Sequence, residues 1–185
     1  MLQEFVQQTE ETARSVLDEI HTALPGTITK FDAGSGTATV KPVGEYQTSD
    51  GKRLEYPAIS GVPLVFPICQ SIGAGIAFPV EKGDSCLIII SEVELDEWRS
   101  GAKSEGTLRF DLTNAIAIPG LLDGGSELLK DAVSKKAVVV ANGDNRIITS
   151  KTMIRLDTGG ARLDVKEDGV EIQGNLKVSG SITNG

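Results

Sequence analysis

The stretch GTITKFDAGSGTATVKPV, residues 26–43, contains two short runs in which aliphatic and polar side chains alternate. This period of two, in residues 26–31 and again in 37–43, is typical of β-strands with one buried face. The residues between them, DAGSG at 32–36, are of the small and polar types that favour turns. The stretch therefore predicts a β-hairpin, and the rest of the fold can be worked out from it.

More strands are predicted as the chain continues. A long polar segment at 44–60 precedes the apolar run GVPLVFP at 61–67. Residues 75–91, GIAFPVEKGDSCLIIIS, predict two strands across the turn EKGD, in which the side chain of Asp84 caps the turn.

A short helical turn and a last strand complete this region. Residues 92–101, EVELDEWRSG, predict the helical turn and present Trp98, and residues 114–122, NAIAIPGLL, predict the strand. About five short strands with one long insertion suit a small closed or partly open barrel of the OB type. We therefore expect a mainly β chain with an OB-type barrel domain at 25–122.

Residues 1–24 are expected to form an N-terminal helix that ends at Pro25-Gly26. Apolar or small residues recur in this segment at steps of four and three, which is the heptad seam of a coiled coil. So short a seam either packs on its own domain, self-associates or docks onto a partner. The seam residues that we expect to be available for docking are Leu2, Val6, Val16 and Ile20.

The composition changes after residue 120. All five Phe, both Tyr and the Trp lie at or before Phe110, and the last of the seven Pro is Pro119. A polar connector at 123–135, in which ELLKDAV predicts a brief helix, leads into residues 136–185. There, short strand-like units recur every six to nine residues, as AVVVANGD, NRIITS, TMIRLDT, ARLDVKED, GVEIQG, NLKVSG and SITNG.

These units have too little apolar bulk to form a core in one chain, because two aliphatic residues per strand barely offset the entropy lost on ordering it. Their period is also too short for a single-chain solenoid. Three identical chains wound about one axis would bury the narrow aliphatic rows and remove the exposed strand edges. The sequence thus predicts an intertwined trimeric β-helix at 136–185, with a trimer core of Ile154, Leu156, Leu163, Val165, Val170, Ile172, Leu176, Val178 and Ile182.

Charge and motif content argue against several classes of function. The net charge of −8 argues against nucleic acid as a partner. A single histidine, His21, and the lack of a phosphate-binding loop or of metal-ligand spacing argue against an enzyme, a cofactor and a metal site. No run is apolar enough for a membrane helix, and the acidic N-terminus is unlike a signal peptide, so synthesis in the cytoplasm is expected. Cys69 and Cys86 are expected to be buried, reduced core thiols.

The order of parts resembles that of the central, membrane-piercing spike proteins of contractile phage tails, R-type pyocins and related injection machines. These proteins combine an OB-type barrel with a triple-stranded β-helix. The barrel segment carries the resemblance, through PGTITKFDAGSGTATVKPV (25–43), VPLVFP (62–67), FPVEKGDSCLIIISEVELDEW (78–98) and FDLTNAIAIPGL (110–121). The tail at 136–185 resembles the family by architecture.

The resemblance implies a homotrimer at the tip of the tail tube, part of a phage virion or tailocin baseplate. Such a spike docks onto hub or tube proteins through its N-terminal side and is driven through the target cell envelope when the sheath contracts, without bond chemistry. Several spikes end in a His-x-His apex that binds iron, which is lacking here. We therefore expect no apex metal, and either a truncated chain or a separate small tip-capping protein seated on Ser181, Ile182, Thr183, Asn184 and Gly185.

Two other functions remain open at this point. A trimeric fibre or adhesin without a role in injection shares the physics of the tail. An OB-type binding module for single-stranded nucleic acid would need a basic groove lined with stacking aromatic residues. The basic residues of the barrel are instead scattered among acids, at Lys30, Lys41, Lys52, Arg53 and Lys82.

Overall fold

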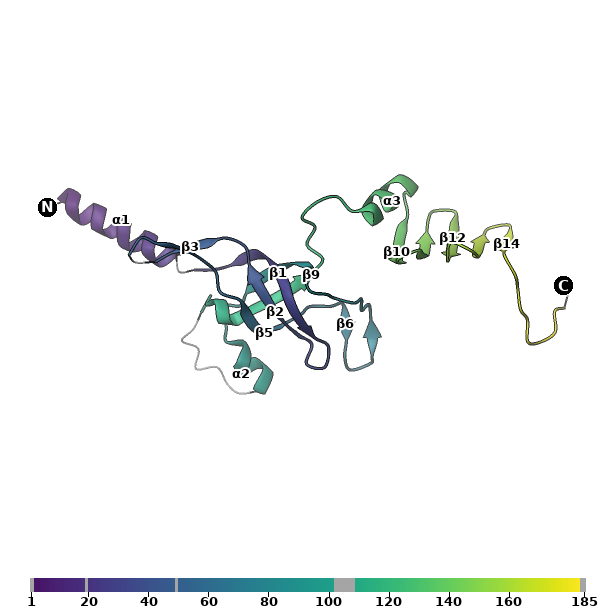
Figure 1. The fold of residues 1–185 in the computed structure, drawn as a ribbon, viewed down its shortest axis with the longest axis horizontal. Helices are drawn as coiled ribbons and strands as arrows, with labels where there is room; N and C mark the ends of the chain where they lie inside the picture. Colours follow the sequence, from purple (N-terminus) through teal and green to yellow (C-terminus); the bar gives the residue numbers. More distant parts are fainter. Residues whose placement is uncertain (1, 19, 49, 102–108, 184–185) are drawn as a thin grey trace. The chain divides into compact units, whose positions relative to one another are not determined.

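The computed structural model describes residues 2–18, 20–48, 50–101 and 109–183. The chain divides into two compact units, Met1–Asp123 and Gly124–Gly185, which are described here one at a time (Figure 1). Within the described ranges, every helix is too short or too polar to span a membrane.

The first unit begins with helix α1, Leu2–Asp18. This helix is shorter than the expected 1–24, because strand β1 already begins at Ala23. Val16, like the other apolar residues of α1 whose side chains are described, is exposed to solvent.

Pro25 and Gly26 lie inside strand β1, Ala23–Asp32, and do not end a helix. The carbonyl of Pro25 accepts a hydrogen bond from the N–H of Val43 at 2.9 Å. Gly26 allows a close approach between strands, because a Cβ at this position would lie 2.4 Å from Cδ1 of Ile88. The signal that we interpreted as a helix stop is therefore a site of tight packing in the barrel.

Five antiparallel strands form a curled sheet, a half-barrel of OB-like type, in the order β5-β2-β1-β8-β9. The hairpin predicted for residues 26–43 is confirmed as β1 and β2. The two edges of the sheet meet where Leu64 forms a parallel bridge with Ala117 and the N–H of Val65 donates to the Ala117 carbonyl at 2.9 Å. Besides β1, the sheet contains β2 Thr37–Pro42, β5 Ile59–Pro63, β8 Ser85–Ile90 and β9 Ala115–Pro119.

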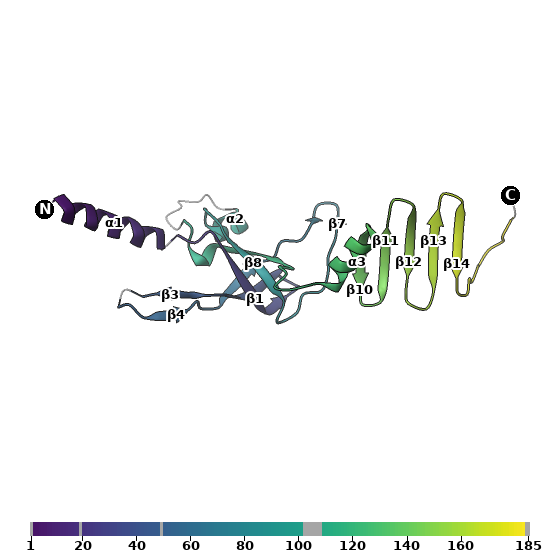
Figure 2. The ribbon, with the colours of Figure 1, turned by 90° about the horizontal axis from the view of Figure 1, so that it is seen from above.

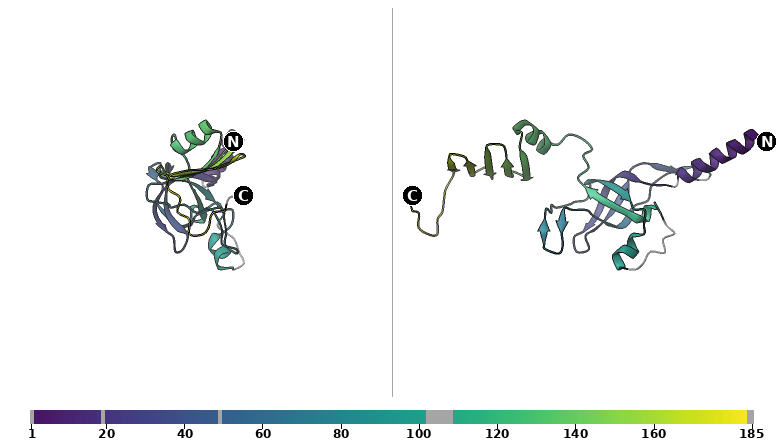
Figure 3. Two further views of the ribbon diagram at one scale, coloured as in Figure 1. Left: turned by 90° about the vertical axis from the view of Figure 1, so that its right-hand side faces the viewer. Right: turned by 180° about the vertical axis from the view of Figure 1, so that it is seen from behind.

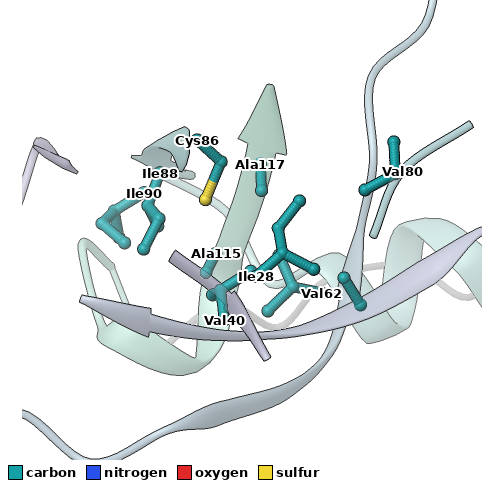
Figure 4. Packing of buried hydrophobic residues seen from close by; sticks show 10 residues of the cluster. Ile28, Val40, Val62, Val80, Cys86, Ile88, Ile90, Ala115 and Ala117 are labelled. Atoms are coloured by element: carbon teal, nitrogen blue, oxygen red, sulfur yellow. The ribbon is translucent and has the colours of Figure 1, made fainter. Parts of the chain in front are cut away.

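Small aliphatic side chains from facing strands fill the barrel (Figure 4). Ile28 and Ile88 are fully buried, and burial alternates along β2 and β8, as the period of two predicts. Cys86 belongs to this core, as expected. Cys69 is exposed, so the prediction of a buried thiol is wrong there, because strand β6 that carries it lies in a hairpin outside the core.

Two short hairpins extend from the barrel. Strands β3 Glu45–Gln47 and β4 Arg53–Glu55 form the first, within the segment that the sequence marked only as a polar insertion. Strands β6 Ile68–Cys69 and β7 Ala74–Gly75 form the second. The strand expected ahead of the EKGD turn is limited to β7, and the residues after it contain Pro79, which has no N–H to donate to a ladder.

The predicted helical turn and the predicted turn cap are both confirmed. Helix α2 spans Leu95–Ser100 and leaves Trp98 exposed. The side chain of Asp84 accepts a hydrogen bond from the N–H of Glu81 at 2.8 Å. A 3-10 turn, η1 Leu112–Asn114, then leads into β9.

The second unit consists of one helix and one sheet. Helix α3, Glu127–Lys135, confirms the helix predicted from ELLKDAV, and the Ser126 hydroxyl caps it by accepting from the N–H of Leu129 at 3.3 Å. Figure 2 shows the five strands that follow side by side in chain order. They are β10 Val138–Asn142, β11 Asn145–Thr149, β12 Met153–Asp157, β13 Arg162–Lys166 and β14 Gly169–Gln173.

Each of these strands pairs antiparallel with its neighbour in the same chain. This pairing differs from our expectation that each chain adds one strand to every turn of a wound β-helix. Among the described residues after β14, up to Thr183, the chain forms no strand, so neither the expected unit NLKVSG nor the described part of SITNG is a strand of the sheet.

Candidate assembly surface

One face of the β10–β14 sheet is built almost entirely from aliphatic side chains. Residues directly opposite one another in paired strands lie on the same face, so the register defines two continuous rows across the sheet. We call these rows together the apolar face. The first row is Val138, Thr149, Ile154, Val165 and Val170, and the second is Val140, Ile147, Leu156, Leu163 and Ile172.

The apolar face is open to solvent in the single chain. Val170 is 62% exposed, Leu156 46% and Val165 40%. Monomeric proteins rarely leave so many neighbouring aliphatic side chains uncovered, and patches of this kind usually mark contact surfaces. None of the ten residues of the face carries a charge.

The structure brings together six of the nine residues expected in the trimer core. They are Ile154, Leu156, Leu163, Val165, Val170 and Ile172, and all lie on the apolar face. The other three, Leu176, Val178 and Ile182, follow β14, are exposed and have no place in the strand register.

Sequence reasoning missed four members of the face, the aliphatic residues Val138, Val140 and Ile147 and the polar Thr149. Their signal was present in the alternation of AVVVANGD and NRIITS. Alternation identifies those units as strands but does not specify how they pair, so it does not show which of their side chains share a face with Leu156.

The opposite face of the sheet is polar and partly covered. Helix α3 lies on this side, which Figure 3 shows with the sheet seen edge on. Asp131 of α3 forms ion pairs with Lys135, at 2.7 Å, and with Arg146 of β11. Ile148, two residues after Arg146 and on the same face, is buried. The two faces of the sheet therefore differ sharply in chemistry.

A buried carboxylate organises the middle of the polar face. Both oxygens of Asp164 accept from the Arg155 guanidinium across the ladder, at 2.7 Å from Nε and 2.9 Å from Nη2. Arg162 lies 3.5 Å from the same carboxylate. These contacts lower the pKa of Asp164, chiefly through the hydrogen bonds from Arg155, and raise the pKa of Arg155.

A second ion pair extends this network to the last strand. Lys166 Nζ lies 2.8 Å from Oε2 of Glu171. The contact raises the pKa of Lys166 and lowers the pKa of Glu171, in both cases mainly through the hydrogen bond between them. Ion pairs thus connect the charged side chains of the polar face, where only the buried Nε of Arg162 lacks a hydrogen-bond partner among the described residues of the sheet. The apolar face is the side that lacks a partner within the described sheet.

The residues expected to dock onto a hub do not form one continuous seam. Val6 and Val16 lie on α1 and are exposed. Ile20 is exposed but follows the end of the helix at Asp18. Leu2 begins α1, and its side chain lies outside the described part of the structure.

The expected platform for a tip protein is described only in part. Ser181, Ile182 and Thr183 lie in an irregular, exposed segment. Asn184 and Gly185 lie outside the described residues.

A comparison with known protein families finds a match within the first unit. The family model described as Phage protein Gp138 N-terminal domain matches residues 24–120, just over half of the 185 residues. The matched segment runs from the start of β1 to the end of β9 and so coincides with the half-barrel. A search of curated proteins gives no match.

Proposed function

Since this chain belongs to the family of phage proteins with the Gp138 N-terminal domain, we propose that it is the central spike of a contractile tail baseplate. The family makes it a bacteriophage protein and is consistent with a place in the tail or baseplate, as a component of the virion. The finer proposal is a homotrimer that is pushed through the target cell envelope when the sheath contracts. In this role the protein catalyses no reaction and binds no cofactor or nucleic acid.

The apolar face of the β10–β14 sheet is the observation that carries the proposal. Covering a Val, Leu or Ile side chain that is already half buried contributes about 1 kcal/mol, so the nine aliphatic residues of the face contribute on the order of 9 kcal/mol per chain. That is comparable with the whole stability of a typical domain. A chain with such a face is therefore expected to associate.

Three copies fit this face because it is narrow and free of aromatic residues. Each five-residue strand presents two side chains to the face, all of them aliphatic or Thr. Three such sheets, turned inward around one axis, enclose a thin dry interior and place the Asp164 network on the outside. Because the strands pair within the chain, the trimer that we propose is a prism of three meander sheets and not the single wound β-helix expected from the sequence.

The proposed mechanism is mechanical. A closed β-structure with a dry interior is stiff, since every strand in it is hydrogen-bonded and its side chains are packed. In the proposal, α1 and the half-barrel form the base, with Val6, Val16 and Ile20 facing hub or tube proteins.

The mass of the native protein in solution tests the proposal. We expect light scattering after gel filtration to give close to three times the chain mass of 19.5 kDa. A stable monomer contradicts the proposal, and a dimer would replace the prism with two sheets packed face to face. Immunogold labelling of intact particles separates a spike, which is labelled at the tail tip, from a fibre or adhesin, which is labelled elsewhere.

A further inference from the structure

The β6–β7 hairpin is a second uncharged surface, and it belongs to the first unit. Residues 56–80 contain no charged side chain, although 44 of the 185 residues of the chain are charged. The hairpin lies in the middle of this run (Figure 1). It exposes Ile72 and Ile76 at 76% and 60%, and Ile68 and Phe78 at 44% and 45%.

The hairpin has a defined shape despite its two-residue strands. The N–H of Ile76 donates to the Pro67 carbonyl at 3.1 Å, which extends the ladder toward the barrel. Phe66 and Phe78 pack edge to face at its base, with ring centroids 5.0 Å apart. At Gly75 a Cβ would lie 2.6 Å from the Pro67 carbonyl oxygen, so the two arms approach closely. An isolated hairpin of this size is at best marginal in water, and contact with a partner would stabilise it.

The chain leaves the barrel at the same end at which this hairpin extends. Leu64 and Ala117 form a parallel bridge, so the segment leading into β6 runs in the same direction as β9. Strand β9 ends at Pro119, and the chain then continues toward the second unit. In a trimer whose axis lies near residue 120 of each chain, the three hairpins therefore also lie near that axis.

The net charge of the chain and the uncharged run at 56–80 favour a second copy of this chain as the partner of the hairpin. Two copies of a chain with net charge −8 repel each other over most of their surface, whereas an uncharged segment can meet its own copy without repulsion. A lipid surface is disfavoured, because the run has no Lys or Arg and is flanked by Glu55 and Glu81, which anionic headgroups repel.

We propose that the β6–β7 hairpin is a second self-association surface, at which the hairpins of neighbouring copies pack together and hold the barrels at one axis. This inference rests on the proposed trimer and assigns part of its interface to the first unit. The contact face is the one that carries Cys69 and Ala74, which are directly opposite in the ladder, and Ile76, two residues further along.

Cys69 is a natural reporter for this contact. Its thiol is exposed in the single chain, whereas Cys86 is buried in the barrel core and serves as an internal control. In the native full-length trimer we expect Cys69 to react with a disulfide reagent such as Ellman's reagent at least about tenfold more slowly than in the Ile76→Asp variant, since access controls thiol reactivity. In the unfolded protein, both thiols of each chain should react with the reagent.

A matched variant controls for a general effect of a new carboxylate. Val93 is also an exposed aliphatic residue of the first unit, at 52%, and lies outside the hairpin. Val93→Asp should leave Cys69 protected, and both variants should remain trimers held by the apolar face.

The outcomes separate this inference from the proposed function. A trimer in which Cys69 reacts at the rate of a free thiol overturns the inference and leaves the spike proposal standing, and so does an Ile76→Asp variant in which Cys69 stays protected. A monomeric wild-type protein overturns both. Flotation of the protein with phosphatidylethanolamine/phosphatidylglycerol vesicles, lost in Ile76→Asp, would assign the hairpin to a membrane and overturn self-association.

Discussion

Replacing Leu156 with Asp tests whether the apolar face holds the assembly together. Leu156 lies in the middle of the second row, between Ile147 and Leu163, and is 46% exposed in the single chain. A carboxylate at this position can still be hydrated in a monomer. The loss of a half-buried leucine should therefore cost the isolated sheet only about 1 kcal/mol.

The same change in a trimer brings three carboxylates into one dry interior. An unpaired buried charge costs several kcal/mol even after the protein relaxes, so three of them cost roughly 10 kcal/mol in total. At about 1.4 kcal/mol for each factor of ten, the association constant should fall by about seven orders of magnitude. At micromolar concentrations the Leu156→Asp variant should be a monomer.

Light scattering and circular dichroism together provide the assay. The wild-type mass should be close to three times 19.5 kDa, and the mass of the variant should be close to 19.5 kDa with the β-sheet spectrum retained. Lowering the pH to about 4 should partly restore assembly, because the introduced carboxyl then becomes neutral. Val133→Asp is the control, since Val133 is an aliphatic residue of α3 that is 68% exposed and lies off the apolar face. A Leu156→Asp variant that stays trimeric, or a Val133→Asp variant that also dissociates, would refute the assignment of this face.

Two further predictions concern the stability of each unit. Ile88→Ala removes a fully buried side chain from the barrel core and should lower the free energy of unfolding of the first unit by about 2–5 kcal/mol, measured by urea denaturation; a change below about 1 kcal/mol would contradict the packing described. Because the pKa of Asp164 is lowered in the folded state, its contribution to stability is present above the unfolded pKa of about 4 and is lost as the pH falls through the folded value. The melting temperature of the wild-type protein should therefore drop below about pH 4, and Asp164→Asn, which leaves Arg155 without its bidentate partner, should melt lower at pH 7 and lose part of that pH dependence.

The barrel could be predicted from sequence because its signals are local and agree with one another. The alternation in residues 26–43 and the capped turn at Asp84 each specify one element without reference to the rest of the chain. The helix boundary could not be predicted in this way. Pro25-Gly26 has the composition of a helix stop, and only the position of Ile88 in a neighbouring strand shows why glycine is required there.

The aliphatic rows of the tail were visible in the sequence, but their pairing was not recognised. Period-two alternation identifies which residues of a strand share a face, and six of the residues predicted for the trimer core, from β12 to β14, lie on one face of the sheet. Alternation alone does not say which strand lies next to which. Val138, Val140 and Ile147 were missed for this reason, since their place on the face follows from the register of β10 with β11 and of β11 with β12.

The residues that connect the strands indicate that neighbouring strands pair within the same chain. Only Gly143 and Asp144 separate β10 from β11, with Gly143 at a φ of 59°, and only Glu167 and Asp168 separate β13 from β14. Two-residue connections of this kind allow an antiparallel hairpin but are far too short for the crossover that a parallel neighbour in the same chain would need. The sequence Asn-Gly-Asp at 142–144 is thus a hairpin signal that outweighs the repeat period.

In-chain pairing also changes how the proposed spike would assemble. A wound β-helix has no strand ladder until three chains have met, whereas each meander sheet satisfies its own backbone and needs partners only for its apolar face. Chains could then fold first and associate afterwards, through side chains alone. The Leu156→Asp monomer distinguishes the two routes: with meander sheets it keeps its β-sheet signal and slow amide exchange from β10 to β14, whereas with wound chains both are lost together with the trimer.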